Sequence, residues 1–201
     1  MSVRAERKLQ SQQTILEQVL KLNYAGHCFN SISLRQLAQA VGMVPSAFYR
    51  FFPNKEQLAV ELVDQTSLMI KSHLNQIAEH VQPKNKESLE QLLTLFCNQV
   101  QQKAAHWHFF IVERWGGDPP LREKISQEQI FLVDDLTQIL SKKYGEQLSQ
   151  PQQLQALAEL NIELHFAWII KWLHCHDETQ KNQLLQCFIQ QLKFVHLPCH
   201  I

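Results

Sequence analysis

A short segment after Pro45 carries side chains that suit contact with a nucleic acid. It is aromatic and basic, and it reads Ala47, Phe48, Tyr49, Arg50, Phe51 and Phe52. Proline is favoured at the first position of a helix, where its missing N–H has no partner to lose, so a helix is predicted at about 45–51. The amino-terminal residues of such a helix are exposed, and in helix-turn-helix proteins they enter the major groove. Phe48 is expected to pack in the core rather than to touch the nucleic acid.

Two helices and a turn would position this segment. Ser33, with Gln36 three residues later, forms the pattern of a capping box, which predicts the start of a helix. Ala38 is small enough for two helices to cross closely, and Gly42 suits a turn that requires a positive φ. Apolar residues that can close the core between the helices are Leu37, Val41, Met43 and Phe48. A helix-turn-helix is therefore predicted over residues 34–52, although any compact helical pair can share part of this spacing.

The charge of the chain is divided unevenly along its length. Residues 1–56 carry seven basic and three acidic side chains, whereas the remainder carries 12 basic and 16 acidic ones. A basic N-terminal segment followed by an acidic remainder favours a polyanionic partner that binds the N-terminal segment alone. Three cations, Arg4, Arg7 and Lys8, precede the first predicted helix at about 9–24. Such an arm can enter a minor groove or follow phosphates, and a frayed, solvated terminus explains it equally well.

The composition favours helices throughout. Only five glycines occur in 201 residues, and few turn signals interrupt long stretches of helix formers. An all-α fold is predicted, with an N-terminal three-helix domain at 1–56 that contains the helix-turn-helix and a C-terminal helical domain at 57–201. A helix at 54–81, which opens at Asn54 with a capping pattern, connects the two. The remaining helices are predicted at 87–103, 104–115, 119–144, 151–175 and 178–196.

Several other kinds of chemistry are not favoured by the sequence. No apolar run is long enough to span a membrane, and the first ten residues lack the apolar core of a signal peptide, so a cytoplasmic protein without membrane insertion is expected. The five cysteines are widely spaced, which favours reduced and mostly buried thiols over disulfides. His174, Cys175 and His176 point about 100° apart on a helix and do not suit one metal ion. No nucleophile motif, paired acid or phosphate loop is present, so neither an enzyme nor a cofactor is predicted.

The stretch from Ser33 to Phe52, followed by Asn54, Lys55, Glu56, Gln57 and Leu58, resembles the DNA-binding motif of the TetR (tetracycline-repressor-like) family. The resemblance in motif covers about residues 9–64, and the rest of the chain is similar to this family in the number and length of its helices. The resemblance implies an all-helical homodimer, without enzymatic activity, that represses transcription by binding a palindromic operator in double-stranded DNA.

The resemblance also implies which residues contact DNA. Ser46, Ala47 and Arg50 would face base edges, in the helix that Pro45 begins. The phosphate contacts would come from Ser33, Arg35, Tyr49 and Lys55. Lys55 opens the connecting helix, where the amide dipole also favours phosphate. The family often has histidine where Phe51 stands here, so one phosphate contact is expected to be missing.

The C-terminal domain is expected to hold a dimer interface and a ligand cavity. The predicted helices at 151–175 and 178–196 are strongly apolar and favour a four-helix bundle with a second copy, although both can simply pack on their own domain. The segment 107–115 is apolar on nearly every face, which predicts a helix that is deeply buried or lines a cavity. Glu113 and Arg114 in it are expected to be paired or to lie at a mouth.

Three short segments of the sequence resemble the TetR subgroup that controls unsaturated fatty-acid synthesis. They are Val-Arg-Ala near the N-terminus, Phe-Tyr-Arg in the second helix of the motif, and Glu113-Arg114 followed by Gly116-Gly117. This similarity implies a long-chain acyl-CoA as the ligand and lipid genes as targets. Its anionic groups would meet Arg114 and Arg122, and its acyl chain would contact Phe96, Trp107, Phe110, Phe131 and Phe166. Two alternatives stay open: a regulator of efflux that binds drug-like compounds, and a helical lipid-binding protein without DNA function.

Overall fold

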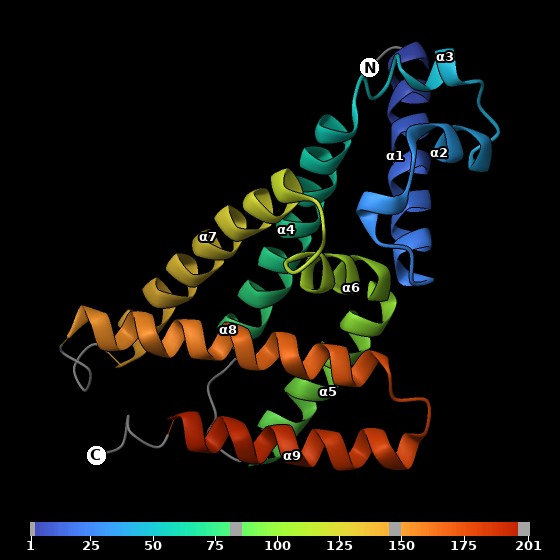
Figure 1. Cartoon of the computed structure of the whole chain (residues 1–201). Coiled ribbons are helices and arrows are strands. Elements are labelled where there is room, and N and C mark those ends of the chain that lie inside the picture. Colours follow the sequence, from blue (N-terminus) through green and yellow to red (C-terminus); the bar gives the residue numbers. More distant parts are fainter. Residues whose placement is uncertain (1–2, 81–85, 145–149, 197–201) are drawn as a thin grey trace. The chain divides into compact units, whose positions relative to one another are not determined.

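The computed structural model describes residues 3–80, 86–144 and 150–196. Within these ranges the chain forms helices joined by turns, without a strand (Figure 1). The elements in chain order are α1 (Val3–Tyr24), η1 (Phe29–Ser31), α2 (Leu34–Ala40), α3 (Pro45–Phe48), α4 (Lys55–His80), α5 (Lys86–Gln102), α6 (Ala104–Glu113), α7 (Pro119–Tyr144), α8 (Pro151–Leu173) and α9 (Glu178–His196). The predicted all-α fold is confirmed, and from α4 onward every boundary lies within two residues of its prediction.

Two compact units make up the chain. The first unit comprises Met1–Leu68 and Ala105–Glu128, and the second comprises Met69–Ala104 and Gln129–Ile201. The first unit thus adds α6 and the start of α7 to the helix-turn-helix, an association between distant segments that was not predicted. The domain boundary between residues 56 and 57 was predicted from function, with DNA binding before it and ligand sensing after it. This functional boundary stays a prediction.

α1 begins earlier than predicted. It starts at Val3, so the basic segment 3–8 forms the first turns of a helix, and the prediction of an arm ahead of the helix was wrong. No glycine or proline interrupts this segment, and the helix dipole favours Glu6 in the first turn. Further along, the Ser11 hydroxyl donates to the Arg7 carbonyl at 2.9 Å, which ties the basic segment to the rest of α1.

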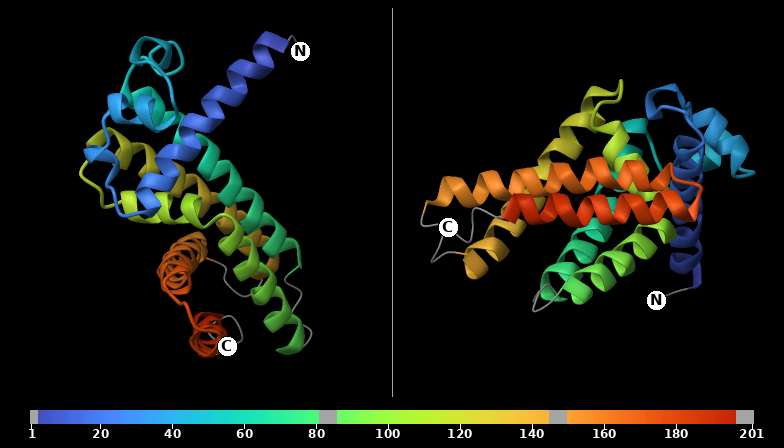
Figure 2. Two further views of the ribbon diagram at one scale, coloured as in Figure 1. Left: turned by 90° about the vertical axis from the view of Figure 1, so that its right-hand side faces the viewer. Right: turned by 90° about the horizontal axis from the view of Figure 1, so that it is seen from below.

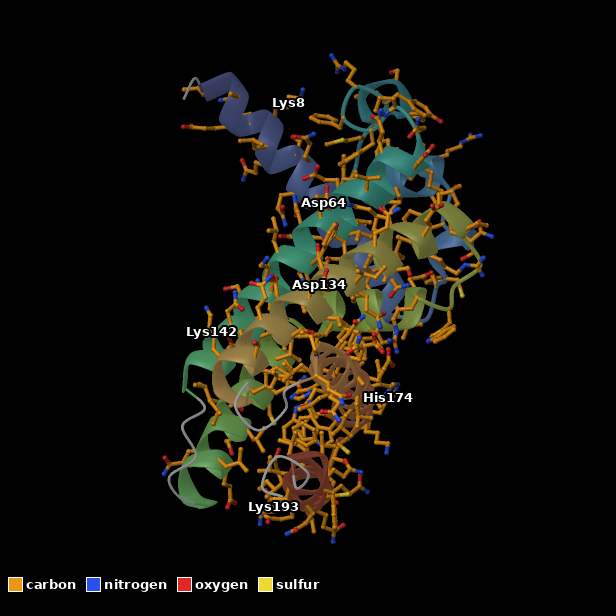
Figure 3. The ribbon with its side chains drawn as sticks, turned by 90° about the vertical axis from the view of Figure 1, so that its left-hand side faces the viewer. Lys8, Asp64, Asp134, Lys142, His174 and Lys193 are labelled. Carbon is orange, nitrogen blue, oxygen red and sulfur yellow. The ribbon has the colours of Figure 1, made fainter. Side chains whose placement is uncertain are left out.

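Apolar side chains from several helices fill the core of the first unit. Its buried members include Ile15, Leu16, Val19, Leu37, Phe48, Leu58, Leu62, Phe109 and Phe110. Phe109 of α6 meets Phe29 of η1 edge-on, with ring centroids 6.2 Å apart. Near the surface, Lys124 of α7 pairs with Asp64 of α4 at 2.8 Å, and Asp64 is labelled in Figure 3. Burying an aromatic side chain such as Phe109 or Phe110 stabilises a fold by about 1.5–3 kcal/mol. α6 is therefore firmly attached to the elements that carry the helix-turn-helix.

An aromatic cluster joins α5, α8 and α9 in the second unit. Trp168 stacks on Phe188 with ring centroids 4.1 Å apart and on Phe96 with centroids 6.5 Å apart. The Trp168 Nε1–H donates to the Leu184 carbonyl at 3.3 Å, so the polar edge of the indole is also satisfied. α8 and α9 lie side by side and antiparallel (Figures 1 and 2). The cluster therefore holds α9 against both α5 and α8.

His165 belongs to the same cluster and is expected to make the stability of the second unit depend on pH. Its ring lies edge-on to Phe188 and to Phe96, with centroids 5.1 and 6.0 Å away. Burial lowers the pKa of His165, although the contact of its Nδ1 with the Asn161 carbonyl acts in the opposite direction. As pH falls below the ordinary histidine pKa of about 6.5, the unfolded chain binds a proton that the folded chain resists. The free energy of unfolding should therefore decrease.

Urea unfolding at about pH 7.5 and about pH 5.5, on the two sides of that pKa, checks this expectation. His165→Phe cannot titrate, so it should lose less stability than the wild type over the same interval. An equal loss in both proteins would assign the pH dependence to other groups.

The described residues also show where the structure stands on membrane spans, metal ligands and cysteines. Among them, no helix is long and apolar enough to cross a membrane, and no group of three or more His, Cys, Asp or Glu side chains could hold a metal ion. Cys97 is buried, and burial raises the pKa of its thiol to about 12, so it stays protonated. Cys28 and Cys187 are exposed, however, so the expectation of mostly buried thiols was wrong for these two.

Candidate nucleic-acid interface

Local hydrogen bonds build the helix-turn-helix. The amide of Gln36 donates to Ser33 Oγ at 3.2 Å, and the amide of Ser33 donates to Gln36 Oε1 at 2.9 Å, so both halves of the predicted capping box are present. Gly42 has a φ of 69°, and the amide of Met43 then reaches the Ala38 carbonyl at 2.8 Å, which closes the end of α2. Pro45 begins α3. The predicted cap, turn and helix start are confirmed.

α3 presents polar side chains around one apolar anchor. Phe48 is fully buried and meets Phe52 with ring centroids 6.2 Å apart, which confirms that it packs in the core. Ser46 and Arg50 are exposed, Tyr49 is 49% exposed, and Ala47 is half-buried. α3 ends three residues earlier than predicted, because the amides of Arg50 and Phe51 bond three residues back in tight turns. The exposed face nevertheless contains the side chains predicted to read DNA.

Lys55, which was predicted to bind a phosphate, lies at the start of α4 beside the segment that precedes α2. Its Nζ donates to the Asn30 carbonyl at 2.9 Å and stands 4.7 Å from the centroid of the Phe29 ring. Burial lowers the pKa of Lys55, whereas the negative charges of Asp118 and Glu113 act in the opposite direction. The ammonium group therefore already has partners within the protein, and its contact with phosphate stays a prediction.

The other predicted phosphate contacts are spread over α1 and α2. Arg35 is exposed on α2, and Arg7 and Lys8 are exposed on α1, where Figure 3 shows Lys8 in the amino-terminal half of the helix. The side chain of Arg4 lies outside the described residues. Ser33 Oγ both accepts from and donates to Gln36, so this hydroxyl is already used as a helix cap. The contacts of these residues with DNA stay predictions.

The residues predicted to bind a ligand are divided between the two units. Trp107, Phe110, Arg114 and Arg122 belong to the first unit, and Phe96, Phe131 and Phe166 belong to the second. The aromatic members are buried except Phe131, which is 59% exposed, and Arg122 is exposed as well. Arg114 Nε donates to the Ile111 carbonyl at 3.2 Å, and its guanidinium lies 5.7 Å from the centroid of the Trp115 ring.

Trp115 corrects the prediction for the segment 107–115. A helix that is deeply buried or lines a cavity was expected over this segment, but α6 ends at Glu113, and Trp115 lies in the following turn with 81% of its surface exposed. Val112 within α6 is also 40% exposed, so the apolar pattern does not bury every face of this helix, and an apolar residue beyond a helix end need not follow its buried face.

Glu113 is buried and paired, as expected for an acid at this position. Its Oε1 accepts hydrogen bonds from Asn23 Nδ2 at 2.6 Å and from the amide of Phe29 at 2.7 Å. Burial raises the pKa of Glu113, and these two bonds act in the opposite direction. Asn23 was not predicted to have a role. It continues the apolar face that Ile15 and Val19 form on α1, and a polar residue on such a face is a signal of a buried hydrogen bond.

The helix-turn-helix and the complete fold both match known proteins. Residues 25–62 match the family model of the bacterial regulatory proteins of the tetR family. A transcriptional regulator from Aquifex aeolicus is 19% identical, with a TM-score of 0.64 over 92% of this chain and 99% of that one. Thermus thermophilus FadR, a TetR family transcriptional repressor solved with lauroyl-CoA, is 17% identical, with a TM-score of 0.57 over 92% of each chain.

A third similar structure is NalD, the secondary repressor of the MexAB-OprM multidrug efflux pump in Pseudomonas aeruginosa. It is 18% identical, with a TM-score of 0.61 over 92% of this chain and 96% of that one. At such identities these three structures establish a common fold and nothing about ligands. Residues 25–62 are thus similar to the bacterial regulatory proteins of the tetR family, and the fold of the chain is similar to that of regulators of this family.

Proposed function

We propose that this TetR-type transcriptional regulator represses genes by binding a palindromic operator as a homodimer, and that a small apolar ligand in its helical body releases it. The exposed surface of α3 and of the turn that follows it carries this proposal. Ser46, Tyr49 and Arg50 project from the surface there, while Phe48 anchors the helix from below. A guanidinium group so placed can donate two hydrogen bonds to a guanine in the major groove, and hydroxyl groups beside it can bind phosphates.

The dimer forms through α8 and α9 in this proposal. α8 exposes Leu160 and α9 exposes Phe194, and a second copy would cover both in a four-helix bundle. Two recognition helices of such a dimer must lie about 34–36 Å apart to enter successive major grooves. A ligand that moves α4 changes this separation and shifts the population away from the DNA-binding state.

Long-chain acyl-CoA is the ligand that we propose, with lipid genes as targets. The fold is shared with FadR from Thermus thermophilus, which was solved with lauroyl-CoA. Buried aromatic side chains of the first unit, such as Trp107 and Phe110, suit an acyl chain, and Arg114 and Arg122 of the same unit suit its anionic end. A second candidate is a regulator of efflux that binds drug-like compounds, which the likeness in fold to NalD favours, since its TM-score of 0.61 exceeds the 0.57 for FadR.

A gel-shift titration with the DNA upstream of the chain's own gene tests the proposal. We expect wild-type protein to retard this DNA, and Tyr49→Ala to weaken the complex by about tenfold, since hydrogen bonds to charged groups contribute that much. Tyr49→Phe is the matched control, because it keeps the ring and removes the hydroxyl alone. Absence of a retarded complex with the wild type would leave only the helical lipid-binding alternative.

The ligand is tested in the same assay by three additions. Lauroyl-CoA should release the DNA, whereas free coenzyme A, which has the anionic groups without the acyl chain, should not. Tetraphenylphosphonium represents the drug-like cations. Release by this cation and not by lauroyl-CoA would favour the regulator of efflux.

A further inference from the structure

The carboxylate of Glu113, at the end of α6, is bonded to the connection between α1 and α2. Asn23 Nδ2, in the last turn of α1, and the amide of Phe29, at the start of η1, both donate to Oε1, at 2.6 and 2.7 Å. Such short distances are typical of hydrogen bonds to an ionised acceptor. Phe29 and Asn23 are buried together with Glu113, so the loss of the carboxylate leaves two buried donors without their protein acceptor.

α6 contacts the same connection at further points. His108 Nδ1 lies 3.1 Å from Asn23 Oδ1, and the His108 ring meets the Tyr24 ring edge-on with centroids 5.3 Å apart. Asn23 Nδ2 also reaches the His27 carbonyl at 3.3 Å, so this one amide bonds both to α6 and to its own loop. The connection 23–30 precedes α2, and it is held by α6 as well as by Lys55 of α4.

The Glu113 carboxylate occupies space that is open only because Gly116 has no Cβ. A Cβ on Gly116 would collide with Glu113 Oε2 and would stand 3.2 Å from both the side-chain Cδ and the backbone oxygen of Glu113. Oε2 itself is buried without a hydrogen-bond partner among the described residues, so no partner holds it away from Gly116. A Cβ on the neighbouring Gly117 would make only an ordinary contact, 3.5 Å from Asn30 Nδ2. The requirement for glycine is thus specific to position 116.

We propose that Glu113 is a positioning residue for DNA binding, and that Gly116 is glycine so that the carboxylate can hold the α1–α2 connection. Glu113 contacts no DNA in this proposal. It acts through Asn23 and Phe29, which fix where α2 begins and hence how the helix-turn-helix is presented. The inference rests on the proposed binding of an operator.

The first test compares Glu113→Ala with Glu113→Gln. The alanine variant should bind the operator about tenfold more weakly, because it leaves two buried donors without their acceptor. The glutamine variant keeps an oxygen that can accept both bonds, so it should retain most of the affinity. Hydrogen exchange at the Phe29 amide, followed by NMR, should accelerate in the alanine variant and much less in the glutamine variant.

The second test uses the two adjacent glycines. Gly116→Ala should weaken operator binding as Glu113→Ala does, whereas Gly117→Ala should leave it unchanged. In the double variant Glu113→Ala, Gly116→Ala, the second substitution should add little, because the carboxylate oxygen with which the new Cβ collides is gone and only the contact with the backbone oxygen of residue 113 remains. Additive effects would show that Gly116 does not act through Glu113.

A stability control separates positioning from simple loss of fold. Leu93→Ala removes a buried side chain of α5 in the second unit, so it should lower the free energy of unfolding without changing operator affinity. All affinities are measured at a temperature at which circular dichroism shows each variant fully folded. Wild-type affinity in Glu113→Ala overturns this inference alone, whereas a wild type that binds no DNA overturns the proposed function as well.

Discussion

Replacing Phe48 with alanine should lower the free energy of unfolding by about 3–5 kcal/mol, as expected for a large ring removed from a packed core. Phe48 is fully buried, and its ring meets Tyr49 and Phe52 with centroids 6.4 and 6.2 Å away. α3 has only four residues, Pro45–Phe48, and a helix of that length cannot persist without such an anchor. DNA binding should therefore be lost although Phe48 faces away from the DNA.

Urea unfolding followed by circular dichroism measures this loss, and Phe51→Ala is the matched control. Phe51 lies three residues further on and is only half-buried, so its replacement should cost clearly less stability. Equal losses from the two substitutions would show that Phe48 is not the anchor of α3.

Arg50→Ala should weaken operator binding by about 1–3 kcal/mol for each half-site, the usual contribution of a guanidinium that reads a guanine. Arg50 is exposed in the turn that follows α3, so the free energy of unfolding should hardly change. A dimer uses both half-sites, so the loss of binding free energy occurs twice in each complex. Arg50→Ala is therefore expected to reduce operator affinity more than any other surface substitution.

Fluorescence anisotropy with the operator and with a scrambled duplex distinguishes base reading from phosphate contact. Arg50→Ala should weaken operator binding much more than binding to the scrambled DNA. Arg35→Ala, the control for a phosphate contact, should weaken both alike and reduce the salt dependence. Arg50→Lys should restore little, since lysine lacks the planar fork. Equal weakening on both duplexes by Arg50→Ala would place Arg50 on phosphate instead.

The parts of the site that could be predicted are those fixed by neighbours in sequence. Ser33 and Gln36 form their cap three residues apart, Gly42 takes its positive φ within one turn, and Pro45 starts α3 by its own ring geometry. Each of these rules acts over a few residues, so the sequence determines the outcome without knowledge of the tertiary structure. The buried position of Phe48 follows from them.

The parts that could not be predicted depend on contacts between distant residues. Asn23 and Glu113 are 90 positions apart, and only the folded chain shows that α6 joins the first unit. The sequence indicated that Glu113 needed a partner, but nothing in it identified Asn23 and Phe29 among the possible donors. The early start of α1 is a different kind of error, because charged residues 3–8 are good helix formers and were interpreted as an arm.

The exposed turn after α6 also gives the protein a spectroscopic reporter. Of its four tryptophans, Trp107, Trp168 and Trp172 are at most 9% exposed, whereas Trp115 is 81% exposed. A water-soluble quencher such as iodide will therefore extinguish the red-shifted emission of one indole and spare that of the other three. Since Trp115 stands between Glu113 and Gly116, this one fluorophore reports, without any label, on the state of the turn that holds the α1–α2 connection.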